Sequence, residues 1–215
     1  ISWSRVCPQG DGAFNDEGIA FYDRFIDDLI ARGIEPMVCL YHFDMPLALA
    51  QEYNGFNDRR VVEAFIRYGK KMIDCFGDRV KYWLTFNEQN IFHMPEAFRI
   101  SGYMKGEKTL RELYELQHHA MVAHMSLTEY LHQTKPGQLM GGMLAHQLIY
   151  PATCKPRDIF CAQQYDEFLN QNLLRVFAGQ GYSPAVMAVV EQEGFGDIYR
   201  ADDLALFART KNDFM

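Results

Sequence analysis

The chain has 215 residues, of which 48% are apolar and 14% aromatic, and this composition supplies enough apolar material for the core of one globular domain. The formal net charge of −7 argues against nucleic acid and anionic membrane surfaces as partners. No apolar run approaches the roughly 18 residues of a membrane span, and no basic segment followed by an apolar one indicates a signal peptide.

The first half of the sequence alternates short apolar runs with amphipathic stretches. The apolar runs at residues 1–5, 34–41 and 80–86 predict strands. Between them, apolar side chains recur at helical spacing from residue 15 to the break at Gly33, and again from residue 58 to Gly77. This half therefore predicts three strands, with a helix after each of the first two.

The second half is predicted to be mainly helical. Thr109 and Glu112 have capping-box spacing and predict the start of a long helix that reaches about residue 133. Residues 138–148 predict a strand, and residues 156–178 a helix whose core stripe includes Phe160 and Phe168. Shorter helices are expected at residues 184–193 and 202–209.

Strands that alternate with helices indicate β-α-β units and a parallel sheet within one domain, residues 1–215. The two parallel solutions are a doubly wound sheet and a TIM (β/α)8 barrel. Polar residues follow each of the first three strands, namely Arg5, then His42 and Asp44, then Asn87 and Glu88. This placement favours the barrel, whose active sites lie at the carboxyl ends of its strands. No glycine fingerprint for a nucleotide occurs.

Glu88 is the first candidate for chemistry at such a strand end. A carboxyl group that is partly removed from water has a raised pKa, stays protonated near neutral pH and can donate a proton to a leaving group. The spacing alone also allows a structural role, in which Glu88 caps the next helix or pairs with a surface cation.

His42 and Arg5 have similar alternatives. His42 has the chemistry of a general base or of a hydrogen-bond donor to a polar substrate, but a buried structural histidine has the same local sequence. Arg5 is suited to neutralise a carboxylate in the same cleft, because its guanidinium is a planar donor that is always charged. An inward structural salt bridge is equally compatible with the sequence.

No metal or cofactor is expected. The four histidines at positions 118, 119, 124 and 132 lack the spacing of a zinc protease and favour a packed or solvated helix face. The five cysteines are an odd number without paired spacing, which indicates neither a disulfide framework nor a zinc site. A reducing, cytoplasmic location fits this pattern best.

Three separated motifs resemble those of a known family. "ISWSR" at residues 1–5, "LYHFDMPLAL" at 40–49 and "TFNEQN" at 85–90 occur in the order and at about the separations typical of glycoside hydrolase family 1. The stretches that follow are also similar, so the resemblance covers essentially the whole chain. "YHFDMP" and "YPATCKPRD" are most similar to the 6-phospho-beta-glucosidases within this family.

The resemblance implies a (β/α)8 barrel that hydrolyses a β-glycosidic bond with retention, using two carboxylates about 5 Å apart and no cofactor. It assigns Glu88 as the acid/base and Asn87 as the amide that holds the sugar 2-hydroxyl. His42 matches the imidazole that binds the glycone, and Arg5 the guanidinium beside the nucleophile. Phe43 stands where the family commonly has Trp, which keeps an aromatic wall but loses an indole donor.

The resemblance also implies that the chain is an incomplete barrel. It matches about the second to the fifth strand and the edge of the sixth, without the first strand or the C-terminal strands. The nucleophile belongs to a "TENG"-type motif that does not occur in the sequence. We therefore expect these residues alone to be inactive, and their unpaired strand edges to favour association, including a homo-oligomer.

The function expected from the resemblance is hydrolysis of small 6-phospho-beta-glucosides, such as phosphorylated cellobiose or aryl glucosides. Two alternatives remain open. One is a beta-glucosidase or beta-galactosidase that acts on unphosphorylated sugars. The other is a homologue that binds carbohydrate without catalysis.

Overall fold

A parallel sheet of three strands organises the structure, a computed structural model that describes all 215 residues. The strands are β1 (Met37–Tyr41), β2 (Tyr82–Phe86) and β3 (Leu139–Gly141), in the order β1-β2-β3. Tyr41 lies opposite Phe86, and Leu84 lies opposite Gly141. The carboxyl ends of all three strands therefore meet at one edge of the sheet.

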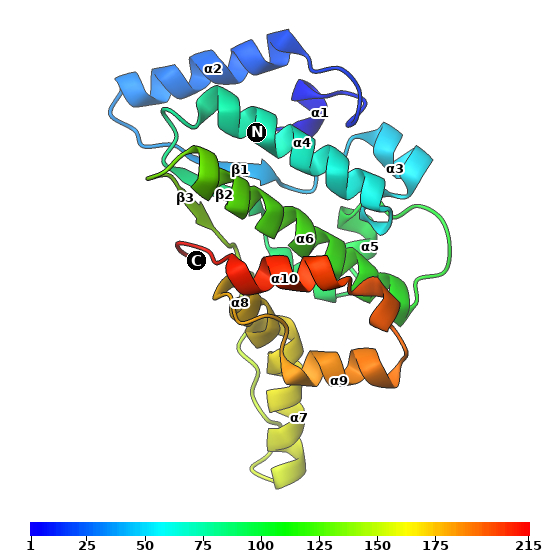
Figure 1. Cartoon of the computed structure of the whole chain (residues 1–215). Coiled ribbons are helices and arrows are strands. Elements are labelled where there is room, and N and C mark those ends of the chain that lie inside the picture. Colours follow the sequence, from blue (N-terminus) through cyan, green and yellow to red (C-terminus); the bar gives the residue numbers. More distant parts are fainter.

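Helices α4 (Arg59–Phe76) and α6 (Leu110–Thr134) pack against each other over one face of the sheet (Figure 1). None of the helices is both long enough and apolar enough to cross a membrane. The other helical elements are α1 (Trp3–Val6), α2 (Asp16–Ala31), α3 (Leu47–Tyr53), η1 (Gly55–Asn57), η2 (Gln89–His93), α5 (Ala97–Ile100), α7 (Pro156–Asp166), η3 (Glu167–Gln171), α8 (Asn172–Phe177), α9 (Pro184–Gln192), η4 (Gly196–Ile198) and α10 (Ala201–Arg209).

An aromatic cluster fills the space between α4 and the first two strands. The rings of Phe65 on α4 and Phe86 on β2 lie 4.7 Å apart between centroids, and Tyr41 on β1 contacts both edge-on. Trp3 stacks on Tyr68 at 5.4 Å. All five side chains are buried. Large aromatic side chains dominate the energetics of a core, so this cluster fixes how β1 and β2 sit beneath α4.

A buried polar network joins α4, α6 and α10. The Asp203 carboxylate accepts hydrogen bonds from the Arg59 guanidinium and from His118 Nε2, the latter at 3.1 Å. Burial raises the pKa of Asp203, but these two donors outweigh it and lower the pKa to about 2. His118 Nδ1 lies 3.0 Å from the Tyr182 hydroxyl. The network therefore anchors α10 to the two helices that cover the sheet.

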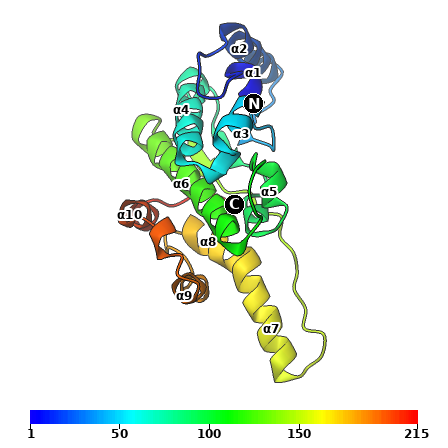
Figure 2. The ribbon, with the colours of Figure 1, turned by 90° about the vertical axis from the view of Figure 1, so that its right-hand side faces the viewer.

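Helix α7 extends away from the rest of the molecule (Figure 2). It has no buried residue, and Phe160, which the periodicity placed in a core stripe, is 63% exposed. That part of the prediction is wrong. The helical run from residue 156 to 177 is confirmed, but only its second half packs into the core, where Leu173 and Phe177 are buried.

Two predicted strands differ from the structure. Residues 1–5 were expected as a strand, but Trp3–Val6 forms the short helix α1, because Trp3 is buried in the aromatic cluster and its backbone N–H donates to Asp44. The strand expected at 138–148 is limited to β3. After Gly141 the chain leaves the sheet, and Gly142 N–H donates to Phe214. The parallel α/β arrangement and the remaining helices are confirmed.

Gly55 and Gly33 provide a matched test of close packing. Both have positive φ, 64° and 75°, but a Cβ on Gly55 would collide with the backbone of Ser101 and Gly102, whereas a Cβ on Gly33 meets nothing within 4 Å. We expect Gly33→Ala to lower the free energy of unfolding by about 1 kcal/mol through backbone strain alone. Gly55→Ala should lower it by about 1–3 kcal/mol more. Denaturant unfolding of both variants checks this, and equal losses would contradict it.

Candidate active site

The candidate site is built from the turns that follow β1 and β2. His42 and Phe43 follow β1 directly, and Asn87 and Glu88 follow β2. The Asn87 N–H donates to the Tyr41 carbonyl at 2.8 Å, which extends the strand pairing one residue beyond β2. The structure thus brings four of the five predicted residues to the same edge of the sheet.

The Glu88 backbone adopts a left-handed conformation, with φ 44° and ψ 55°. This conformation is unfavourable for a residue with a Cβ, so surrounding contacts must hold it. Met143, just past β3, provides two of them: the Glu88 N–H lies 3.0 Å from Met143 Sδ, and the Gln89 N–H donates to the Met143 carbonyl at 3.0 Å. The Glu88 carboxylate is partly exposed and has no hydrogen-bond or ion-pair partner in the structure.

Asn90 joins the same two segments. Its fully buried carboxamide donates to the Ala145 carbonyl and accepts from the Ala145 N–H, both at 2.9 Å. Neither Asn90 nor Met143 was a predicted site residue. The polar end of "TFNEQN" drew attention to the segment, but the pairing with residues 143–145 requires the arrangement of the sheet.

His42 and Phe43 form the neighbouring turn. Phe43 also has a positive φ, 64°, and the two rings meet edge to face at 5.3 Å. Asp44 stabilises the turn, because its carboxylate accepts hydrogen bonds from the Trp3 N–H at 3.0 Å and from the His42 N–H at 3.3 Å. The His42 side chain itself is exposed. Strained backbone of this kind occurs often at functional sites.

Arg5 is the predicted residue that the structure does not place with the others. It lies on α1, is exposed, and its guanidinium carbon is 4.7 Å from the centre of the Phe21 ring on α2. It makes no ion pair, and none of its side-chain atoms forms a hydrogen bond. This position supports a cation–π contact between α1 and α2. The role that the resemblance implies for Arg5, beside the nucleophile, stays a prediction.

A buried histidine lies behind the end of β2. His124 on α6 contacts the Thr85 hydroxyl through Nδ1 and the Asn212 side-chain oxygen through Nε2 at 2.8 Å. Since Asn212 Oδ1 only accepts, Nε2 carries the proton and Nδ1 accepts from Thr85. Burial lowers the pKa of His124 to about 4, so the ring is neutral at pH 7. The histidines of the long helix thus include one that supports the strand of the site.

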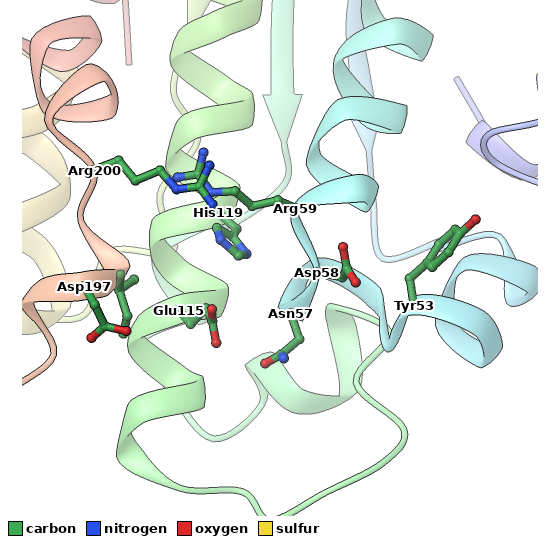
Figure 3. Close-up of a pocket in the computed structure, with 9 residues that line it drawn as sticks. Tyr53, Asn57, Asp58, Arg59, Glu115, His119, Asp197 and Arg200 are labelled. Atoms are coloured by element: carbon green, nitrogen blue, oxygen red, sulfur yellow. The ribbon is translucent and has the colours of Figure 1, made fainter.

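Other features of the structure lie outside this edge. A polar pocket of about 300 Å³ is lined by nine residues from α3, η1, α4, α6 and the segment around η4 (Figure 3). It contains none of the predicted site residues. No group of three or more His, Cys, Asp or Glu residues is arranged to bind a metal ion.

The sequence is similar to a known family and to individual proteins. The sequence model described as Glycosyl hydrolase family 1 matches residues 1–215. The aryl-phospho-beta-D-glucosidase BglC of Bacillus subtilis is 36% identical over 215 residues, which is 100% of this chain and 45% of that protein. The 6-phospho-beta-glucosidase AscB of Escherichia coli is 39% identical over 196 residues, 90% of this chain and 41% of that protein.

Solved structures match the fold of this chain over nearly its whole length. The AHE enzyme from Alicyclobacillus herbarius matches with a TM-score of 0.85 and 28% identity, over 98% of this chain and 48% of that one. The beta-glucosidase from Thermotoga maritima in complex with glucoimidazole matches with a TM-score of 0.84 and 27% identity, over 98% and 47%. The chain therefore spans less than half the length of these relatives.

The burial of His124 predicts a pH dependence of stability. Its pKa is about 4 in the fold and about 6.5 in an unfolded chain. Between these values the unfolded chain binds a proton that the folded chain does not, so the free energy of unfolding decreases as pH falls from 6.5 to 4. His124→Gln should reduce this slope by at most about 1.4 kcal/mol per pH unit.

Denaturant unfolding at several pH values measures the slope. His146→Gln is the matched control, because the His146 side chain is exposed and folding does not bury it. His93 and His119, which burial also gives pKa values of about 4, keep their contributions in both variants. A slope that His124→Gln leaves unchanged would contradict the prediction.

Proposed function

Because the chain belongs to glycosyl hydrolase family 1, we propose that it is the acid/base half of a retaining glycosidase. Glu88 protonates the leaving group and then activates water, while a second carboxylate acts as the nucleophile. Asn87 holds the sugar 2-hydroxyl, and His42 and Phe43 bind the glycone. Arg5, which lies on α1 over the Phe21 ring, is proposed to stand beside that nucleophile in the complete enzyme.

The observation that carries the proposal is the position of Glu88. It follows a parallel strand at its carboxyl end, in a left-handed turn. Its carboxylate makes no hydrogen bond or ion pair with another protein group. Active sites of (β/α)8 barrels lie at this end of the strands. An acid/base must reach the glycosidic oxygen, and a carboxylate engaged in an ion pair would have to break that pair first.

The substrates that we propose are 6-phospho-beta-glucosides. Relatives with 36% and 39% identity are named as enzymes for phosphorylated glucosides, whereas the beta-glucosidase structure that matches has 27% identity. The sequence variant "YHFDMP" agrees with this choice. The ratio of kcat/KM for an aryl 6-phospho-beta-glucoside and its unphosphorylated counterpart tests it, and a preference for the unphosphorylated sugar would favour the beta-glucosidase alternative. We also propose a cytoplasmic location, which the pattern of cysteines favours.

The three-stranded sheet contributes part of the barrel in this proposal. A TIM barrel closes with eight strands, and the chain pairs three in an open sheet. The matched relatives are more than twice as long as the part that this chain covers. We propose that the remaining strands and the nucleophile come from the rest of such a longer enzyme.

Glu88→Gln in the complete enzyme tests the acid/base role. Gln keeps the size of the side chain but cannot donate the proton. We expect kcat/KM for a substrate with a poor leaving group, such as an alkyl glycoside, to fall by about 10²- to 10⁴-fold. A dinitrophenyl glycoside, whose leaving group needs no proton, should lose far less in the first bond cleavage. Glu96→Gln is the control, because Glu96 is exposed near the same segment. Equal losses for both substrates would refute the assignment.

The 215-residue chain on its own should not hydrolyse glycosides. Retaining hydrolysis needs two carboxylates on opposite sides of the sugar, and the "TENG"-type motif of the expected nucleophile does not occur in the sequence. Incubation of the purified chain with a dinitrophenyl 6-phospho-beta-glucoside should release dye only at the uncatalysed rate. Dye release above the uncatalysed rate would contradict this prediction.

A further inference from the structure

We propose that Met143 is a positioning residue for Glu88, which it holds in the left-handed turn through its thioether sulfur. This inference rests on the proposed acid/base role and adds to it the group that orients the carboxyl. Met143 belongs to the segment after β3 and does not need to touch the substrate to act. Its effect on the reaction passes through the backbone of Glu88.

The contact between the two residues is direct. The Glu88 N–H points to Met143 Sδ at 3.0 Å, and the next N–H in the chain, that of Gln89, donates to the Met143 carbonyl at 3.0 Å. One residue therefore accepts from two consecutive donors of the turn. A thioether is a weak acceptor, but no other acceptor meets the Glu88 N–H in the structure. Without the sulfur this donor must find water.

The backbone of Glu88 needs such support. At φ 44° the residue occupies a region that side chains with a Cβ rarely adopt. The direction of the Cα–Cβ bond, and with it the carboxyl, depends on this φ. If the turn relaxes toward negative φ, the carboxyl moves away from the edge of the sheet. Small displacements of a catalytic group are costly, since proton transfer requires hydrogen-bond distance in the transition state.

The segment that carries Met143 is itself fixed. Gly142 N–H donates to Phe214, and a Cβ on Gly142 would collide with the Phe177 ring, so the backbone passes close to the core there. Two residues after Met143, Ala145 exchanges two hydrogen bonds with the buried Asn90. The backbone is thus fixed on both sides of Met143. This limits the movement of the sulfur, so that it can act as a hydrogen-bond acceptor and not only as a packing group.

Two variants at position 143 of the complete enzyme distinguish a hydrogen-bond acceptor from a packing group. Met143→Leu conserves the apolar volume but accepts no hydrogen bond, whereas Met143→Gln has a similar length and offers an amide oxygen. The control is Met140→Leu, because Met140 is buried on β3, three residues before Met143, and its sulfur makes no hydrogen bond to Glu88. Each variant is assayed with an alkyl and a dinitrophenyl glycoside, and its thermal unfolding is recorded.

Met143→Leu should lower kcat for the alkyl glycoside by about 2- to 5-fold, the effect of one weak hydrogen bond, with KM and the dinitrophenyl reaction nearly unchanged. The alkaline limb of its pH profile, which reports the acid/base group, should move, and the limb of the Met140→Leu control should not. Met143→Gln should recover most of the loss. These results together would establish the positioning role.

Three outcomes would overturn it: a normal rate for Met143→Leu on both substrates, equal losses on both, or Leu and Gln variants that behave alike. The first two are interpreted beside Glu88→Gln. If Glu88→Gln retains its strong dependence on the leaving group while Met143→Leu shows none, only the role of Met143 fails. If Glu88→Gln shows no such dependence, the acid/base assignment fails as well.

Discussion

The pairing of β1 with β2 is the interaction on which the site depends. Tyr41 lies opposite Phe86, and the Asn87 N–H continues the ladder to the Tyr41 carbonyl. A parallel register that shifted by one residue would turn the side chains of one strand to its other face. The aromatic residues Tyr41 and Phe86 prevent this, since both are buried against Phe65. The packing between the sheet and α4 therefore determines where the turns that carry His42 and Glu88 begin.

Above this rigid layer the backbone is strained. Phe43 and Glu88 are two of the three residues other than glycine with positive φ, and each is the second residue beyond the end of a strand. Each turn is held by a residue that is distant in the sequence. The Trp3 N–H donates to the Asp44 carboxylate, beside Phe43, and Met143 accepts from the Glu88 and Gln89 N–H groups through its sulfur and its carbonyl. Strain and its compensation are thus close together in space but far apart in sequence.

This separation explains what the sequence could predict. The long helices and the polar ends of the strands follow from local periodicity and composition, so Asn87, Glu88 and His42 were found from the sequence. The contacts of Met143 and Asn90 join segments about 55 residues apart, as the hydrogen bond between Asn90 and Ala145 shows, and no local pattern encodes them. The strand predicted at residues 1–5 failed because burial of Trp3 in the aromatic cluster outweighed β propensity. Arg5 therefore lies on α1 and not at the end of a strand, and its role beside the nucleophile stays a prediction.

The helical run at residues 156–177 is buried to different degrees along its length. Its first part, α7, buries no side chain, while α8 packs into the core, and the π-helical segment η3 lies between them. Local opening of a helix costs little where few apolar contacts must break. We therefore expect the amide hydrogens of α7 to exchange with solvent through fraying of the helix alone, and those of α8 to exchange only when the core around Leu173 opens. A single continuous helix in this protein thus contains two regions of different local stability, with the boundary at the π-helix.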